Sequence, residues 1–281
     1  MGILTEELIE FNQILKVNTK YDLSNYSTKS LTRRIDIILD DNKLNFNGLL
    51  YKIKNNKEFV EQIIKDITVN TTELFRDPKN WHCVKYKILP ELAKRKTINI
   101  WHAGCSTGQE VYSMLILLKE LDLFDKTNVY ASDINKDVID FAKKGTYKFR
   151  FNLNYLDNFD NVIKKNPFNY DDIKDIPYEK YFTIDKSNDV ILMNNELKNK
   201  PRWAVGDLVK KENPFFIKYD LILCRNVLIY FDNYLQYNTI KLFNDSLYDN
   251  SYLMLGAHES IIGNGEIYFK KKNKFYIKKK K

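Results

Sequence analysis

The segment AGCSTGQE (Ala103–Glu110) places two glycines, two hydroxyl residues and an acid between a strand-like run, INIWH (98–102), and a helix-like run, VYSMLILLKEL (111–121). Gly104 and Gly108 allow a tight turn after the strand and a close approach of backbone to ligand. The helix that follows points its first amide groups at the same place. The segment predicts a ligand-binding turn, with an ordinary strand-to-helix connection as the alternative. Its G-x-x-x-G spacing differs from the G-x-G-x-x-G of dinucleotide-binding loops.

Strand-like and helix-like runs alternate on either side of this turn. Such alternation predicts an α/β fold with a largely parallel, doubly wound sheet, in which ligands bind beyond the carboxyl ends of the strands. The further runs are NVYASDI (128–134), KDVIDFAKKG (136–145), YDLILCRN (219–226), LQYNTIKLFNDSLY (235–248) and a closing pair, YLMLGAHES (252–260) with NKFYIKK (273–279).

The rest of the chain divides by pattern. Leu4, Leu8, Phe11 and Leu15 recur at helical spacing, and similar patterns continue to residue 67. We therefore expect a helical domain over 1–67, a linker and connecting helix over 68–96, and the sheet domain over 97–281. Residues 146–203 interrupt the alternation and are interpreted as an inserted subdomain containing a hairpin around SND (187–189).

The second predicted strand ends at Asp133. A carboxylate at this point can accept two hydrogen bonds from a ribose diol, so a glycine turn after one strand and an acid after the next predict a nucleoside site. The pattern is shared by NAD enzymes and S-adenosylmethionine methyltransferases. A helix cap before KDVIDFAKK is the structural alternative for Asp133.

Composition restricts the class of protein further. The net charge is +8, but eight of the last twelve residues are lysine, and removing them from the 45 basic residues leaves 37 against 37 acidic ones. We interpret the excess as a solvated tail, which disfavours nucleic acid as a partner. Three widely separated cysteines without a CxxC pair favour reduced thiols in the cytoplasm, and three histidines without ligand spacing predict no metal site. No apolar run is long enough to span a membrane.

Six segments together resemble the bacterial chemotaxis receptor methyltransferases, or CheR-type enzymes. They occur in that family's order and cover essentially the whole chain. The segments are NTTELFRD (70–77), AGCSTGQEVYS (103–113), ASDI (131–134), AKKGTY (142–147), CRNVLIYFD (224–232) and LGAHES (255–260).

The resemblance implies a Rossmann-like class I methyltransferase sheet with an N-terminal helical domain and a small inserted β-subdomain. It implies S-adenosylmethionine as the methyl donor, S-adenosylhomocysteine as product, and O-methylation of chemoreceptor glutamates for sensory adaptation. The expected donor-binding residues, with Gly104 taken from the turn, are Asn70, Thr72, Arg76, Gly104, Glu110, Asp133, Asp207, Leu208, Arg225 and Asn226. Asp207 stands where the family usually has Asn, and Gln109 and Val111 replace its usual Glu and Pro.

The resemblance also implies catalytic roles for Arg76 and Tyr230, with a structural ion pair and a core aromatic as the respective alternatives. Lys29, Arg33 and Arg34 lie at spacings that place them on one helix face. This basic face is expected to dock on the acidic helical bundle of a receptor, and a solvated face is the alternative. We expect a monomer. The rival functions are a nucleic-acid methyltransferase, for which no base-extrusion motif is visible, and a receptor-binding scaffold without turnover.

Overall fold

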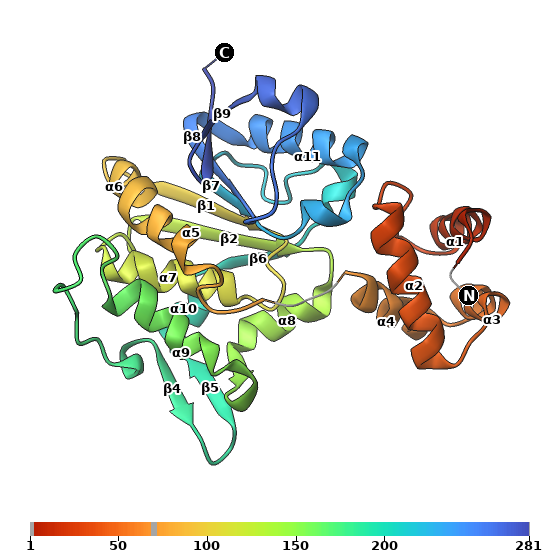
Figure 1. The fold of residues 1–281 in the computed structure, drawn as a ribbon, viewed down its shortest axis with the longest axis horizontal. Helices are drawn as coiled ribbons and strands as arrows, with labels where there is room; N and C mark the ends of the chain where they lie inside the picture. The colour runs from red at the N-terminus through yellow and green to blue at the C-terminus, as the bar shows by residue number, and fades with distance from the viewer. Residues whose placement is uncertain (1–2, 69–71, 281) are drawn as a thin grey trace.

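A computed structural model describes residues 3–68 and 72–280. Its central element is a seven-stranded sheet with the order β6-β2-β1-β7-β8-β10-β9 (Figure 1). The first five strands in this order are mutually parallel, and β10 and β9 close the sheet in antiparallel orientation. The sheet strands are β1 (Ile98–Ala103), β2 (Thr127–Asp133), β6 (Arg202–Val205), β7 (Tyr219–Cys224), β8 (Leu247–Leu255), β9 (Phe269–Lys272) and β10 (Phe275–Lys278).

Alternating side chains of the central strands feed two cores. In β1, Ile98 and Ile100 pack into the core beneath α7, whereas Trp101 and Ala103 pack into the core beneath α11. Burial on both faces explains why these strands are continuous apolar runs. The helices of the sheet region are α5 (Pro78–Cys83), α6 (Leu89–Leu92), α7 (Gln109–Glu120), α8 (Lys136–Lys144), α9 (Asn154–Phe159), α10 (Asn195–Asn199) and α11 (Asn233–Ser246).

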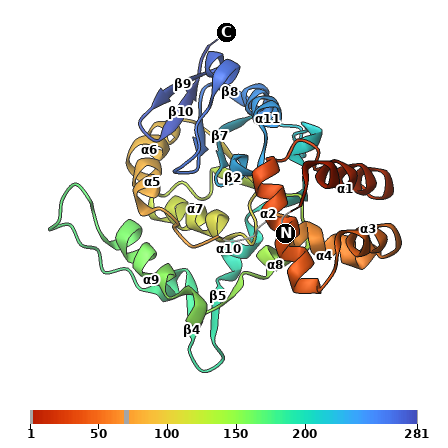
Figure 2. The same cartoon turned by 45° about the vertical axis from the view of Figure 1, so that its right-hand side comes forward.

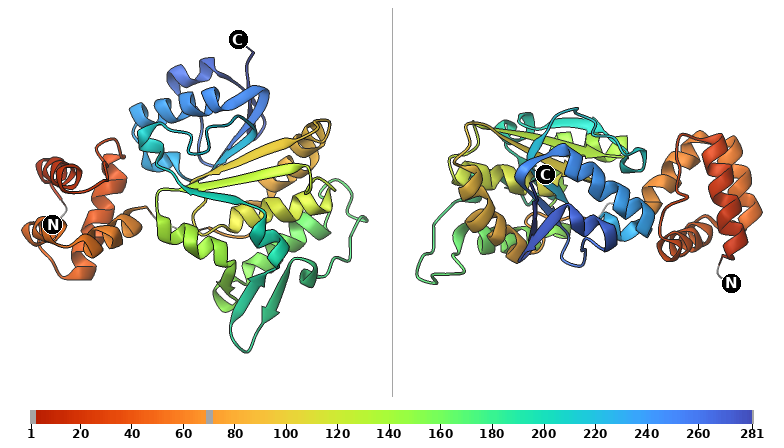
Figure 3. Two further views of the ribbon diagram at one scale, coloured as in Figure 1. Left: turned by 180° about the vertical axis from the view of Figure 1, so that it is seen from behind. Right: turned by 90° about the horizontal axis from the view of Figure 1, so that it is seen from above.

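The N-terminal region contains four helices around a separate core that includes Phe11, Ile35 and Ile63. They are α1 (Thr5–Asn18), α2 (Thr28–Asn42), α3 (Phe46–Asn55) and α4 (Lys57–Ile67). Figure 2 and both views of Figure 3 show this bundle beside the sheet region, with α2 and α4 nearest to it. An ion pair between Lys65 of α4 and Asp137 of α8 joins the two regions.

A second, three-stranded antiparallel sheet with the order β3-β5-β4 lies between α8 and β6 in sequence. Its strands are β3 (Thr146–Lys148), β4 (Phe182–Asp185) and β5 (Val190–Met193), and residues 187–189 lie in the β4–β5 turn. Arg202–Val205, at the expected end of the insertion at about residue 203, pair with β2 as strand β6 of the main sheet. The sequence of β6 contains only a short apolar run. This strand is partly exposed and lies at an edge of the main sheet.

The interpretation of the C-terminal lysines as a solvated tail is only partly right, because most of them are exposed but four lie in strands. Lys270, Lys271 and Lys272 belong to β9, the edge strand that pairs with β10. Lys278 in β10 is buried, donates a hydrogen bond to the Leu247 carbonyl at 2.8 Å and pairs with Asp249 at 3.3 Å. These lysines are therefore part of the folded sheet. Within the described residues no helix is both long and apolar enough to cross a membrane.

Candidate active site

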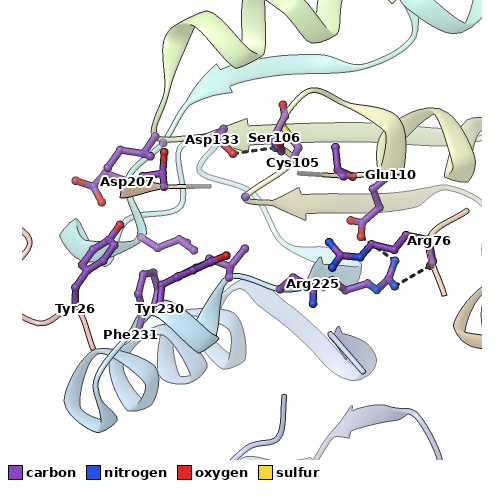
Figure 4. Close-up of a pocket in the computed structure, with 18 of the residues that line it drawn as sticks. Tyr26, Arg76, Cys105, Ser106, Glu110, Asp133, Asp207, Arg225, Tyr230 and Phe231 are labelled. Carbon is purple, nitrogen blue, oxygen red and sulfur yellow. Dashed lines mark hydrogen bonds and ion pairs between the residues drawn. The ribbon is translucent and has the colours of Figure 1, made fainter. Parts of the chain in front are cut away.

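The main pocket lies beyond the carboxyl ends of β1, β2 and β7, where a doubly wound sheet binds ligands (Figure 4). It is an open cleft, and most of its lining residues come from the ends of these strands and from the segments that follow them. Among the described residues, every expected donor-binding residue lines it, and so does Tyr230: Thr72, Arg76, Gly104, Glu110, Asp133, Asp207, Leu208, Arg225, Asn226 and Tyr230. Asn70 lies outside the described residues.

The glycine turn forms the floor of the pocket beside β1. Gly104 has φ +78°, and a Cβ atom there would lie 2.5 Å from the side chain of Val227. Gly108 has φ +90° and starts α7. Ser106 is also left-handed, with φ 50°, and its amide donates to Asp133 at 2.9 Å. Glycine at 104 thus brings the backbone of the turn against the segment after β7, and glycine at 108 brings it against Ala142 of α8 and Trp203 of β6.

Asp133 is buried at the end of β2. One carboxylate oxygen accepts from the Ser106 amide at 2.9 Å and the other from the Asn135 amide at 3.0 Å. Burial raises the pKa of Asp133, although these amide donors partly offset that effect. Each oxygen retains a lone pair for a ligand donor.

Asp207 follows β6 and occupies the same end of the pocket as Tyr26 in Figure 4. Its carboxylate accepts from the Val209 amide at 2.9 Å, so it caps a short helical turn. Burial raises the pKa of Asp207 as well. The substitution of Asp for the family's usual Asn therefore leaves an acceptor within the pocket.

Glu110 belongs to a buried network that the sequence did not reveal. Its two oxygens meet His102 Nδ1 at 2.8 Å and an Arg225 terminal nitrogen at 3.2 Å. The other Arg225 terminal nitrogen donates to the Arg76 carbonyl at 2.9 Å and to Asp77 at 2.8 Å. Burial opposes the charge on Glu110, but the His102 hydrogen bond and the Arg225 charge keep its pKa below the ordinary value. Arg225 thus positions neighbouring groups as well as lining the pocket.

Arg76 lies at the Glu110 end of the pocket (Figure 4). Its two neighbours, Phe75 and Asp77, both have positive φ, 51° and 58°. Such backbone is costly for residues other than glycine and persists where surrounding contacts impose it. Here the Phe75 amide donates to Ser113 at 2.7 Å, and the Arg225 guanidinium holds the Arg76 carbonyl and Asp77. The backbone of Arg76 is therefore fixed on both sides.

Tyr230 stands in a turn that one partly buried carboxylate, that of Glu259, organises. Glu259 accepts hydrogen bonds from the backbone amides of Asn226 at 2.8 Å, Val227 at 2.9 Å and Ile229 at 3.2 Å. Asn226 is left-handed, with φ 61°. The motif LGAHES contained Glu259, but its sequence gave no sign of this role, because residues 226–229 and Glu259 meet only in the fold.

The basic residues predicted to dock a receptor lie on α2, with Lys29 and Arg33 exposed and Arg34 partly buried. The three cysteines are free and buried. In the parts of the chain that the structure describes, no cluster of three or more His, Cys, Asp or Glu side chains has the arrangement of a metal site.

A largely parallel sheet with a glycine turn after β1, an acid at the end of β2 and a pocket over both is the nucleoside-binding arrangement that class I S-adenosylmethionine-dependent methyltransferases share with NAD enzymes. Residues 70–277 match the CheR methyltransferase, SAM binding domain, and the chain belongs to this family. The family match assigns the chain to the methyltransferase class.

Curated relatives agree with this assignment. The chain is 34% identical to the Pseudomonas putida methyltransferase Cher3, covering 86% of this chain and 84% of that protein. It is 30% identical to a chemotaxis protein methyltransferase of Borreliella burgdorferi, covering 94% of this chain and 91% of that protein. A TehB-like methyltransferase structure from Corynebacterium glutamicum is more distant, at 14% identity and a TM-score of 0.39 over 72% of this chain and 95% of that one.

The pocket fits S-adenosylmethionine. The buried Ser106 hydroxyl oxygen has no hydrogen-bond partner within 3–68 and 72–280, and the amide of the same residue donates to the Asp133 carboxylate. Four carboxyl groups and two guanidinium groups of the described residues line the pocket, an excess of acid that suits a sulfonium cation. Asp133 and Ser106 would hold the ribose, Asp207 and Leu208 the adenine, and Glu110 and Arg76 the charged amino-acid end.

Proposed function

We propose that this methyltransferase modifies glutamate side chains on the cytoplasmic helices of chemoreceptors, forming glutamyl methyl esters that serve sensory adaptation. The enzyme would act in the cytoplasm as a monomer. Relatives named chemotaxis protein methyltransferases support the substrate class. When bound, S-adenosylmethionine supplies an electrophilic methyl group on its sulfonium.

The chemistry of the acceptor decides what the protein must supply. A glutamate carboxylate is already ionised near neutral pH, so the reaction needs no general base. The pocket must align the carboxylate oxygen and exclude water. The Arg76 guanidinium is suited to grip a carboxylate through two hydrogen bonds, and the Tyr230 hydroxyl to donate one more. Both side chains line the pocket, and the contacts described above fix their backbones.

The main observation in support of an acidic substrate is the position of α2. The Ser27 amide donates to the Tyr230 carbonyl at 2.8 Å, and α2 begins at the next residue. Exposed Lys29 and Arg33 therefore stand on a helix that starts beside the proposed catalytic tyrosine. The basic first half of α2 would orient an acidic helical bundle toward the pocket.

Methyl transfer to candidate receptors tests the proposal. The full chain is incubated with S-adenosylmethionine carrying a labelled methyl group and with cytoplasmic receptor fragments. We expect label on the receptor that is released as methanol in mild base, because an ester hydrolyses and a methylated amine does not. A base-stable label would contradict the glutamyl ester. Binding of donor and receptor without any label would instead support the scaffold without turnover.

A further inference from the structure

The helical bundle closes one end of the donor pocket. Most lining residues come from the sheet region, but Tyr26 precedes α2 and Thr68 follows α4. Ile134, which also lines the pocket, packs against the core of the bundle. The pocket is therefore shared between two parts of the chain that have separate hydrophobic cores.

Backbone contacts fix Tyr26 in this position. Tyr26 and Phe231 form an antiparallel bridge, flanked by hydrogen bonds from the Ser27 amide to the Tyr230 carbonyl at 2.8 Å and from the Asp232 amide to the Asn25 carbonyl at 2.9 Å. The Tyr26 ring meets the Phe231 ring edge to face, with centroids 5.4 Å apart. Ring placement is thus set by the same segment that carries Tyr230.

The hydroxyl group of Tyr26 is available to a ligand. It makes no hydrogen bond to any side chain or backbone group within 3–68 and 72–280, and Figure 4 shows it directed toward Asp207, away from Arg76 and Glu110. Burial and the nearby charges of Asp207 and Asp133 raise the pKa of Tyr26, so the phenol stays protonated and remains a donor.

We propose that Tyr26 is a donor-binding residue: its ring walls the nucleoside end of the S-adenosylmethionine pocket, and its hydroxyl donates a hydrogen bond to the nucleoside. The proposal rests on the donor pocket described above. If Tyr26 has this role, the helical bundle is part of the donor site. The same bundle carries the basic face of α2. Tight donor binding then requires the bundle to be seated on the sheet region.

Calorimetric titration with S-adenosylhomocysteine and with adenosine tests this role. Tyr26→Phe keeps the ring and removes the hydroxyl, so both ligands should bind about 3- to 10-fold more weakly, the value of one hydrogen bond. Tyr26→Ala should weaken both by roughly 10- to 100-fold, because the apolar wall is lost as well. The factor should be similar for the two ligands, since adenosine contains the whole nucleoside end.

Two matched variants separate this role from a general effect on the interface. Tyr51→Phe removes an exposed hydroxyl on α3. Lys65→Ala breaks the partly exposed ion pair to Asp137, which contributes too little to unseat the bundle and does not line the pocket. Both should bind the ligands as the parent does. Parental affinity in Tyr26→Phe, or an equal loss in Lys65→Ala, would overturn the proposal. Failure of the parent itself to bind S-adenosylhomocysteine would instead contradict the donor site.

Discussion

Two buried carboxyl groups of the donor pocket respond differently to their surroundings. Glu110 meets His102 and the Arg225 guanidinium, and these partners outweigh burial and lower its pKa. Asp133 has only amide donors, so burial prevails and its pKa is raised. Glu110 is consequently held by protein groups, whereas Asp133 is left with acceptor capacity that a ligand diol would use.

Donor affinity should fall as the pH is lowered. Asp133 and Asp207 accept hydrogen bonds best when ionised, and the protonated form predominates below the pKa. Because burial raises both pKa values, the loss should begin above the ordinary aspartate value of about 4. Calorimetric titration with S-adenosylhomocysteine at decreasing pH measures this. An Asp133→Asn, Asp207→Asn double variant should bind weakly with a flat profile, and an equally steep profile would assign the effect to other groups.

Loss of the Tyr230 hydroxyl should slow methyl transfer while donor binding persists. One hydrogen bond that strengthens in the transition state predicts a roughly ten- to thousandfold lower rate for Tyr230→Phe in single turnover at saturating donor and receptor. Tyr234→Phe removes an exposed hydroxyl four residues later and should retain the parental rate.

Arg76→Ala should cost more than Tyr230→Phe, and Arg76→Lys should restore only part of the rate, because a point charge cannot reproduce the two-pronged guanidinium. The same single-turnover assay measures both. Near-parental rates for Tyr230→Phe and Arg76→Ala would exclude the positioning role. A rate loss that saturating donor fully reverses would make these residues donor-binding only.

At the scale of elements, α2 carries the basic residues proposed to dock the receptor, and it begins beside the proposed catalytic residue Tyr230. Reversing Lys29, Arg33 and Arg34 to Glu should raise the receptor concentration needed for half-maximal methylation and leave the affinity for S-adenosylhomocysteine unchanged. The matched control reverses Lys270, Lys271 and Lys272 on β9, which alters the net charge equally on another element. Unchanged methylation at low receptor concentration, or an equal defect in the β9 control, would remove α2 from the interface.

The elements differ in how far the sequence predicts them. The strands β1, β2 and β7 are buried on both faces and therefore appear as apolar runs, and Gly104 and Asp133 mark the ends of two of them. Edge strand β6 lacks such a run, because water contacts part of it. Glu259 escaped notice because its amide partner Val227 is 32 residues away in the sequence. His102 is only eight residues from Glu110, but no local pattern indicates that the strand and the helix after it bring the two side chains together. Such hydrogen-bond networks form only in the assembled fold. The local pattern of residues in the sequence therefore does not predict them.

At the scale of the molecule, donor binding should stabilise the junction between bundle and sheet. S-adenosylhomocysteine occupying a pocket lined by Tyr26, Thr68 and the sheet region would resist separation of the two parts. We expect the amides of Ser27 and Asp232, which bridge the junction, to exchange with deuterium roughly tenfold more slowly when the ligand is bound. The Asn56 amide, bonded within the bundle, is the internal reference. Equal protection of all three, or none, would contradict a localised effect.

The lysines of β9 have a consequence for the enzyme at high concentration. The strand is an outer edge of the main sheet, and its unpaired backbone groups would otherwise template pairing with a second molecule. Three consecutive exposed lysines, Lys270 to Lys272, impose like-charge repulsion on any such encounter. We therefore expect the charge excess that resembles a nucleic-acid signal in the sequence to oppose edge-to-edge association of the open sheet in a crowded solution.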